Sequence, residues 1–460
     1  MSSIQKKEKT DFILISPETD ALEERCLNIC KEFSYSFRRE VSVDALADEG
    51  DHPEGRLIVV STLIGHDKNS AAGLIQVAKH FFPDSFIVCL VGKRINKEAA
   101  AFVKKSGANL IILEDEIYNT SKLEFVCTQV IKASFIPIKV SDLDTQFPIS
   151  FGIYHFMPMR QKFLKCAFPG DTLDEAKMQK LSSVGEFYVK REEVDEFKNY
   201  INLITEGSQA SLEKRCRVQY LSLKKNYADL VFLLTDQSEF GDYEKGKNML
   251  NTCQELSKEI LISLGSLGSA WGVVNNTKMG DFGSIERATA VAAYAGLAAL
   301  QMGMKKVDEI MVCALLADIG LVFIPPNISK KIRDDLVDQL TPEERAVYET
   351  YPFQSLQIAL DRKLPMESQI RDIIVSTHEA VDGTGFPKKL LGNKVSVEAQ
   401  LIHFCNILDN ATMIKMGEKR KDFDVVRSEL ILNLDQGSKF SIKLMELLKA
   451  HFVKGNLKVG

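Results

Sequence analysis

The chain has 460 residues, of which 45% are apolar and 26% charged, and its formal net charge is −5. This length is typical of about three domains, and the composition is that of a globular protein. The charge balance gives no reason to expect nucleic acid or an anionic membrane as a partner. We expect neither a membrane span nor a signal peptide, because no apolar run is long enough for either. The nine cysteines include no CxxC pair, which favours reduced thiols in the cytoplasm over a zinc site.

Residues 1–134 alternate strand-like and helix-like segments. Four short apolar runs are typical of buried parallel strands, and two segments between them have helical spacing. The runs lie at 12–16, 57–61, 86–91 and 109–113, and the helical segments at 70–81 and 96–108. Gly107, after two lysines, is expected to end the second helix. This alternation predicts a doubly wound α/β sheet.

The stretch HFFPDSFIVCLVGKRINKEAAAFVKKSGANLIIL resembles the receiver domain of bacterial response regulators. A working receiver binds Mg²⁺ with acidic residues and accepts a phosphoryl group on an Asp after its third strand. The resemblance places the matching positions at Ser16-Pro17-Glu18, Ser61, Val91-Gly92 and Glu114. Glu18 and Asp67 are interpreted as ordinary surface acids. We therefore interpret residues 1–134 as a pseudo-receiver, which serves as a docking or dimerisation module.

Residues 135–206 contain short segments rich in β-branched and aromatic residues, with a PGD turn signal at 169–171. They predict a small β-rich domain with a helix or two, in which His155 is interpreted as a packed histidine. Residues 207–279 carry apolar residues at spacings of three and four, which predicts long helices. We expect these helices to link the modules; pairing with a second copy of the chain is an alternative.

Five further segments follow in order towards the C-terminus. They are SIERATAVAAYAGLAALQMGM, CALLADIGLVFIP, LTPEERAVYETYPFQSLQIAL, IVSTHEAVDGTGFPKKLLGNKVSVEAQLIHFCNILDNAT and LNLDQGSKFSIKLMELLKAHF. In sequence and order they resemble the HD-GYP domain, a bacterial helical phosphohydrolase fold that hydrolyses cyclic di-GMP. The resemblance implies an all-helical HD-type domain over residues 280–460.

Intact HD-GYP domains hold two or three metals of the Fe or Mn type with His and Asp side chains. The resemblance places seven ligand positions at Ser284, Ala317, Asp318, Tyr351, Thr377, His378 and Asn406. Only Asp318 and His378 keep a family ligand, and two ligands are too few for a catalytic metal site. We therefore expect no metal cofactor. Leu321 replaces the usual Lys, and His403, one turn before Asn406, is not interpreted as a ligand.

The signature loop survives in the sequence although most ligands do not. Its residues are Asp382, Gly383, Gly385, Phe386 and Pro387, with Phe386 in place of the family's Tyr. The two glycines permit positive φ, Pro387 fixes the exit direction, and Asp382 is expected to cap local amides. We interpret Asp318 and His378 as a buried pair, hydrogen-bonded to each other.

Three functions remain open at this point. The leading interpretation is a non-catalytic signalling protein that contacts other signalling proteins, whose identity the sequence does not give. An alternative is a cyclic di-GMP sensor without hydrolysis, for which Lys388, Lys389 and Lys394 supply cations and Tyr351 an aromatic surface, although Gln400 stands where an Arg is common. A residual metal-dependent phosphodiesterase is the third.

Overall fold

The computed structural model describes residues 10–16, 20–41, 57–62, 68–83, 85–92, 95–132, 135–157, 162–184, 187–204, 209–236, 243–265, 270–277, 284–334, 336–413, 422–434 and 438–453. The chain divides into two compact units. The first comprises residues 1–133, 232–242 and 322–330, and the second comprises residues 134–231, 243–321 and 331–460. This division is coarser than the four predicted domains, whose boundaries remain predictions.

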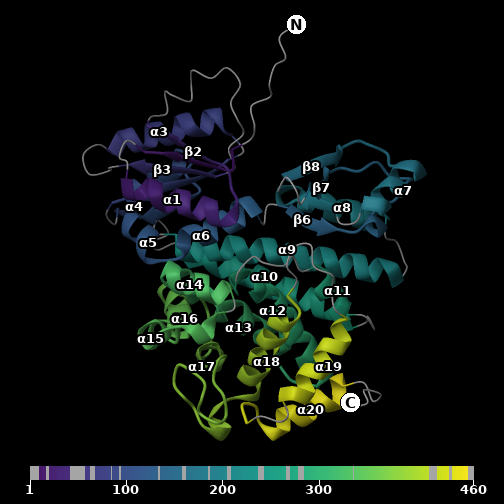
Figure 1. Ribbon diagram of the computed structural model, residues 1–460. Helices are drawn as coiled ribbons and strands as arrows, with labels where there is room; N and C mark the ends of the chain where they lie inside the picture. The colour runs from purple at the N-terminus through teal and green to yellow at the C-terminus, as the bar shows by residue number, and fades with distance from the viewer. Residues whose placement is uncertain are drawn as a thin grey trace. The chain divides into compact units, whose positions relative to one another are not determined.

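Five parallel strands form the sheet of the first unit, in the order β2-β1-β3-β4-β5 (Figure 1). They are β1 (Phe12–Ile15), β2 (Phe37–Glu40), β3 (Leu57–Thr62), β4 (Phe86–Val91) and β5 (Leu110–Leu113). The predicted N-terminal parallel α/β sheet is therefore confirmed. The sequence pattern misses β2, because this edge strand reads FRRE and its side chains are only half-buried.

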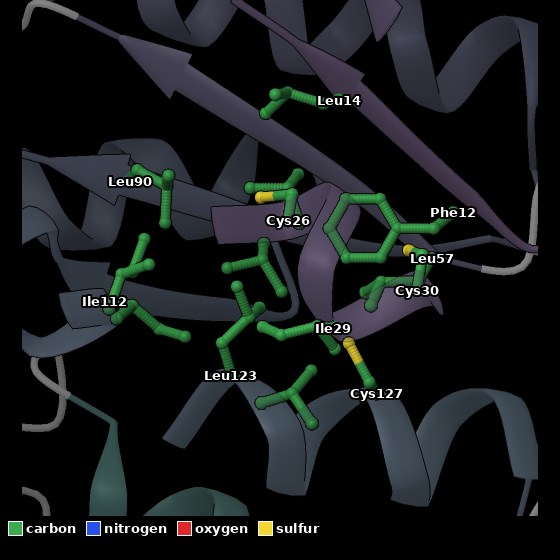
Figure 2. Close-up of a cluster of buried hydrophobic side chains, with 14 of the residues drawn as sticks. Phe12, Leu14, Cys26, Ile29, Cys30, Leu57, Leu90, Ile112, Leu123 and Cys127 are labelled. Atoms are coloured by element: carbon green, nitrogen blue, oxygen red, sulfur yellow. The ribbon is translucent and has the colours of Figure 1, made fainter. Parts of the chain in front are cut away.

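Apolar side chains cover both faces of this sheet. Alternate strand residues face opposite sides, so Phe12 and Leu14 lie in one core cluster and Ile13 and Ile15 in another. Figure 2 shows the first cluster, where Cys127 packs with residues of the strands. The helices are α1 (Asp20–Phe33), α3 (Lys68–Phe81), α4 (Lys97–Lys105), α5 (Glu114–Asn119), α6 (Lys122–Cys127) and the π-helix η1 (Thr128–Lys132). Helices α1, α5 and α6 contribute to the first cluster, and α3 and α4 to the second.

The structure describes some of the positions expected for a receiver site. Ser16 is buried after β1, Ser61 is half-buried in β3, and Glu114 begins α5. Gly92 follows β4, and its missing Cβ would lie 3.7 Å from a Glu114 carboxylate oxygen. Pro17, Glu18 and Asp67 lie outside the described residues. Gly107 has a φ of +117° just after α4, as expected for a residue that ends a helix.

The β-rich segment forms an antiparallel sheet in the order β6-β9-β7-β8 (Figure 1). Its elements are β6 (Phe135–Ile138), η2 (Val140–Asp142), β7 (Ile153–Met157), β8 (Lys162–Ala167), α7 (Glu175–Val184), β9 (Phe187–Lys190), η4 (Arg191–Glu193) and α8 (Val194–Ile204). One face carries an aromatic cluster that includes Phe135 and Tyr188, and the other packs on α7 and α8. His155 is partly buried with its ring 5.9 Å from that of Phe187.

The rest of the chain is helical. Its helices are α9 (Gln209–Thr235), α10 (Tyr243–Gly265), α11 (Ala270–Thr277), α12 (Ser284–Gln301), α13 (Val307–Ala317), α14 (Pro326–Arg333), α15 (Pro342–Tyr348), α16 (Tyr351–Asp361), α17 (Ser368–Ser376), α18 (Val397–Ala411), α19 (Phe423–Leu434) and α20 (Ile442–Phe452). The 3₁₀ segments are η5 (Ile319–Phe323), η6 (Val337–Gln339) and η7 (Gly392–Lys394). Within the described part of the chain, none of the helices has the length and apolarity needed to cross a membrane.

Helix α12 lies at the centre of the helical domain. Residues 288–299 are all buried, and most of them are small. Their size lets α13 pack closely, since a Cβ on Gly296 would lie only 2.6 Å from the sulfur of Met311. Helix α18 also packs against α12. The two neighbours of α12 therefore bring distant parts of the sequence together at one site.

The predicted linker at 207–279 is helical, as expected, but it is not a free spacer. Val218 and Leu221 of α9 belong to the same core cluster as the β-rich segment's Phe187 and Phe197. The first part of α9 therefore completes the core of that segment.

Candidate functional site

Asp318 is held at the end of α13. It is the C-terminal cap of that helix, follows Ala317 directly, and is only 6% exposed. The hydroxyl of Ser355 donates to the Ala317 carbonyl at 2.6 Å and accepts from the Gly320 amide at 2.8 Å. These bonds fix the backbone on both sides of Asp318. Leu321, at the usual Lys position, is buried and apolar.

Tyr351 begins α16 and lies between Asp318 and His378, the two positions that keep an expected ligand type. Its buried hydroxyl donates to Asp318 Oδ1 at 3.2 Å and is also hydrogen-bonded to Nε2 of His378. The Asp318 and His378 side chains lie 3.6 Å apart at the same atoms, Oδ1 and Nε2. The expected direct hydrogen bond between Asp318 and His378 is therefore replaced: the two side chains are neighbours, and each is hydrogen-bonded to the Tyr351 hydroxyl. Burial first, and then the Asp318 carboxylate, raises the pKa of Tyr351 well above its usual value.

His378 lies just beyond α17, after Thr377. Thr377 is buried and its hydroxyl donates to the Ile374 carbonyl of its own helix at 3.1 Å. The ring of His378 stacks on Phe386 of the signature loop, with centroids 5.0 Å apart and planes at 11°. The ring that replaces the family's Tyr therefore packs on the surviving histidine.

His403 of α18 also borders the site. Its ring centroid lies 5.5 Å from that of His378, and its Nδ1 lies 3.2 Å from the Glu379 carbonyl oxygen. Burial, reinforced by the neighbouring His378, lowers the pKa of His403 to about 3. His403 is thus a neutral packed histidine at ordinary pH.

The signature loop is held by hydrogen bonds and close packing. Asp382 accepts from the Thr384 amide at 2.9 Å and from the Ser438 hydroxyl at 2.9 Å, so the expected capping role is present. Gly383 has a φ of +80°, as expected. Gly385 does not have positive φ; instead, a Cβ there would lie 2.2 Å from the Ala380 amide nitrogen. The reason for glycine at 385 is therefore close approach of the backbone, which corrects the expectation.

The backbone of this loop has one special peptide bond, and a neighbouring carboxylate holds its end. The Phe386–Pro387 peptide bond is cis. The fully buried carboxylate of Glu379 accepts from the amides of Lys388 at 2.6 Å and Leu390 at 2.8 Å. The sequence pattern did not single out Glu379, although its place directly after His378 was a signal. The side chains of Lys388, Lys389 and Lys394 are exposed.

Arg287 of α12 is the second residue that sequence reasoning missed. Its Nε donates to Asp409 Oδ2 at 2.6 Å, and its Nη2 donates to Asn406 Oδ1 at 2.9 Å. Asn406, an expected ligand position, is therefore engaged by a guanidinium. Ser284 is the first residue of α12, but its side chain lies outside the described residues. The signal for Arg287 was its place one turn after Ser284.

The donors do not fit a two- or three-metal cluster. Across the residues that the structure describes, no group of three His, Cys, Asp or Glu side chains is arranged to hold a metal ion. Asp318 and His378 supply only two side chains of the kind that bind a metal, and both are hydrogen-bonded to Tyr351. Gln400 is buried and joins the Val395 carbonyl to the Ser441 amide, so it serves the local fold.

The helical part of the chain is similar to known proteins. Residues 276–431 match the family model described as HD domain. Cyclic di-GMP phosphodiesterase PdeB of Borreliella burgdorferi is 32% identical over 151 residues, or 32% of this chain and 37% of that protein. The 3′3′-cGAMP-specific phosphodiesterase 2 of Vibrio cholerae is 26% identical over 210 residues, or 45% of this chain and 37% of that protein. The chain thus spans well under half the length of these relatives.

A solved structure gives a more distant likeness. Bd1817, an HDG"Y"P protein from Bdellovibrio bacteriovorus, aligns with a TM-score of 0.45 and 19% identity, covering 69% of this chain and 98% of that one. On these sequence matches, the helical part of this chain is similar to the HD domain family model and, over part of its length, to bacterial proteins named as cyclic di-GMP phosphodiesterases.

Proposed function

We propose that this chain is a non-catalytic signalling protein of the cytoplasm, whose degenerate HD-GYP domain acts through contacts with other proteins. The observation that carries the proposal is the hydrogen bonding of Tyr351 to both Asp318 and His378. Hydrolysis of a phosphodiester by this class of fold needs metal-bound hydroxide and cations that neutralise the developing charge. Here Asp318 Oδ1 and His378 Nε2, which a metal would need as ligand atoms, are hydrogen-bonded to the Tyr351 hydroxyl.

The remaining expected ligand positions support the same proposal. Ala317 has no donor atom in its side chain. The Thr377 hydroxyl is turned to the Ile374 carbonyl, and the Asn406 amide oxygen accepts from Arg287. At each of these three positions the side chain either is hydrogen-bonded to another group of the domain or has no atom that could bind a metal.

The N-terminal sheet completes the proposed signalling protein. We assign it as a pseudo-receiver, because Ser61 stands where a working receiver carries its phosphorylated Asp. Its role would be docking or dimerisation. Incubation with acetyl phosphate and Mg²⁺ should leave the mass of residues 1–134 unchanged, and a gain of one phosphoryl group there would contradict this assignment.

Binding of a cyclic dinucleotide without hydrolysis is a second candidate. Two curated relatives are named for cyclic di-GMP and 3′3′-cGAMP. Lys388, Lys389 and Lys394 are exposed beside the signature loop and are suited to phosphate groups. If this candidate is right, calorimetry with cyclic di-GMP will detect binding that is lost when the three lysines become Ala and kept when exposed Lys443 becomes Ala.

Activity and metal content test the leading proposal. The parent and an Asp318→Ala variant are incubated with cyclic di-GMP or 3′3′-cGAMP and Mn²⁺ or Fe²⁺, and metal is measured in the purified proteins. We expect product formation at the same background level in both and less than one metal per chain. Faster hydrolysis by the parent than by Asp318→Ala would establish a residual phosphodiesterase and overturn the proposal.

A further inference from the structure

The proton on the Tyr351 hydroxyl sets the direction of two hydrogen bonds. A phenol has one proton, and the Tyr351 hydroxyl donates it to Asp318 Oδ1 at 3.2 Å. The contact with His378 Nε2 therefore needs a proton from the histidine, so Nε2–H donates to the phenol oxygen. A protonated Nε2 has no lone pair for a metal. The phenol thus engages Asp318 Oδ1 and His378 Nε2, the two ligand atoms that lie nearest to each other.

The Arg287 guanidinium makes a second connection in the same domain. It donates to Asp409 Oδ2 at 2.6 Å, to Asn406 Oδ1 at 2.9 Å and to the Asn406 carbonyl at 3.3 Å. Asp409 is only 2% exposed, so its carboxylate needs a charged partner. Arg287 belongs to α12, and its two partners belong to α18.

Together these connections link the elements that carry the expected ligand positions. Tyr351 ties the end of α13 and the start of α16 to the segment after α17, and Arg287 ties α12 to α18. A metal cluster would cross-link the same elements, and the free energy of metal binding then adds to that of folding.

We propose that Tyr351 and Arg287 take over the cross-linking task of the metals, so that the HD domain reaches its folded arrangement without metal. We call the Asp318, Tyr351 and His378 contacts the tyrosine junction. The inference rests on the proposed non-catalytic function. It goes further because it gives Tyr351, at an expected ligand position, and Arg287, beside another, the role of holding the helices together. Tyr351 and Arg287 are positioning residues in this proposal.

The first test is thermal unfolding of the full chain with and without EDTA. The parent should keep the same Tm in both conditions. Tyr351→Phe removes the hydroxyl and leaves Asp318 and His378 without it, so its Tm should fall by several degrees. The matched control is Tyr348→Phe, since the ring of this partly buried tyrosine lies 5.4 Å from that of Tyr351. Its Tm should stay close to that of the parent.

The second test needs no destabilised variant. Nitrogen-15 spectra of histidine-labelled parent, assigned with a His378→Gln variant, report which ring nitrogen carries the proton. We expect His378 to be protonated on Nε2. A His378 protonated on Nδ1 alone, or a Tyr351→Phe variant as stable as the parent, would overturn the tyrosine junction.

The two proposals fail in different ways. If the purified parent contains stoichiometric metal and its Tm falls in the presence of EDTA, both the non-catalytic function and the tyrosine junction are wrong. If the parent is metal-free and independent of EDTA but Tyr351→Phe has no effect, only the junction is wrong.

Discussion

At position 351 a phenol and an imidazole offer their neighbours different chemistry. Burial, and next the Asp318 carboxylate, keep the pKa of Tyr351 well above its usual value, so the phenol stays neutral. A neutral phenol can donate one hydrogen bond and accept another, which suits a position between Asp318 and His378. An imidazole at this position would offer a lone pair suited to a metal. One side chain thus changes what this group of residues can do.

Glu379 gives a prediction at the same scale. Its buried carboxylate accepts from the amides of Lys388 and Leu390, so Glu379→Ala would leave two backbone donors without that partner. We expect the free energy of unfolding to fall by roughly 2–4 kcal/mol, measured by urea denaturation. Asp372→Ala, on the exposed face of α17, is the control and should change it by less than about 0.5 kcal/mol. Equal effects of the two variants would contradict the role given to Glu379.

At the scale of elements, the approach of α16 to the end of α13 depends on a missing side chain. A Cβ on Gly320 would lie 2.2 Å from the Tyr351 carbonyl oxygen and 2.8 Å from the Ser355 amide nitrogen. These are backbone atoms, which cannot move aside as a flexible side chain does. Glycine at 320 therefore lets the two elements place Tyr351 beside Asp318.

Gly320→Ala should separate these elements. We expect a loss of about 1–3 kcal/mol or more in the free energy of unfolding, because the added methyl overpacks a rigid contact. Gly272→Ala in α11 is the matched control: nothing lies within 4 Å of its added Cβ, and alanine favours a helix by up to about 1 kcal/mol. A Gly320→Ala variant as stable as the control would show that this close approach is unimportant.

Because Arg287 of α12 is hydrogen-bonded to Asn406 of α18, restoring the expected ligands involves Arg287 as well. Five substitutions, Ser284→His, Ala317→His, Tyr351→His, Thr377→His and Asn406→Asp, rebuild the expected ligands, with about 1–3 kcal/mol of overpacking at Ala317. The Arg287 guanidinium would pair with the new carboxylate at position 406. We therefore expect metal content, measured by elemental analysis, to rise with the five changes and to rise further with Arg287→Gln.

Circular dichroism controls for folding in that experiment. If both variants keep the helical content of the parent and neither binds more metal than the parent, the placement of these positions around one site is wrong.

At the scale of the molecule, the β-rich segment and the helices of the second unit share a core and a buried ion pair. Arg217 of α9 is hydrogen-bonded to Asp142 of η2, and their side chains are only 5% and 1% exposed. Val218 and Leu221 of α9 lie in the core of the β-rich segment. The same helix also contacts the helical domain, since the Tyr220 hydroxyl lies 3.4 Å from the Thr289 hydroxyl of α12. These parts are therefore expected to unfold together.

A double-mutant cycle tests this expectation. Arg217→Met alone should lower the free energy of unfolding by about 3–5 kcal/mol, because it leaves the Asp142 charge buried. The double variant with Asp142→Leu should lose less than the two single changes summed. Fluorescence of Trp271, the only tryptophan, reports the unfolding of the helical domain. The exposed pair Lys258–Glu255 is the control, with an effect of about 0–1 kcal/mol. If the Arg217→Met variant shows the same unfolding transition by Trp271 fluorescence as the parent, the β-rich segment and the helical domain do not unfold together.

The sequence alone predicted most of the element types and a resemblance to one domain family. Apolar runs gave β1, β3, β4 and β5, because a strand buried on both faces is apolar throughout; the charged edge strand β2 escaped the same rule. Landmarks such as the signature loop predicted the HD domain, because the spacing of glycine, proline and capping residues is local information. The sequence also placed Asp318 and His378 beside each other, but it predicted a direct hydrogen bond where the Tyr351 hydroxyl is bonded to both.

Only the tertiary structure decided what surrounds that pair. Tyr351 is 33 residues from Asp318 and 27 from His378, and Arg287 is 122 residues from Asp409. No local pattern carries such contacts, since they arise when α12 and its neighbours α13 and α18 pack together. The same holds for Gly385, whose small size serves a backbone approach rather than its own φ. Periodicity and spacing act along the chain, whereas hydrogen-bond partners and steric limits are set by the packing of elements far apart in sequence.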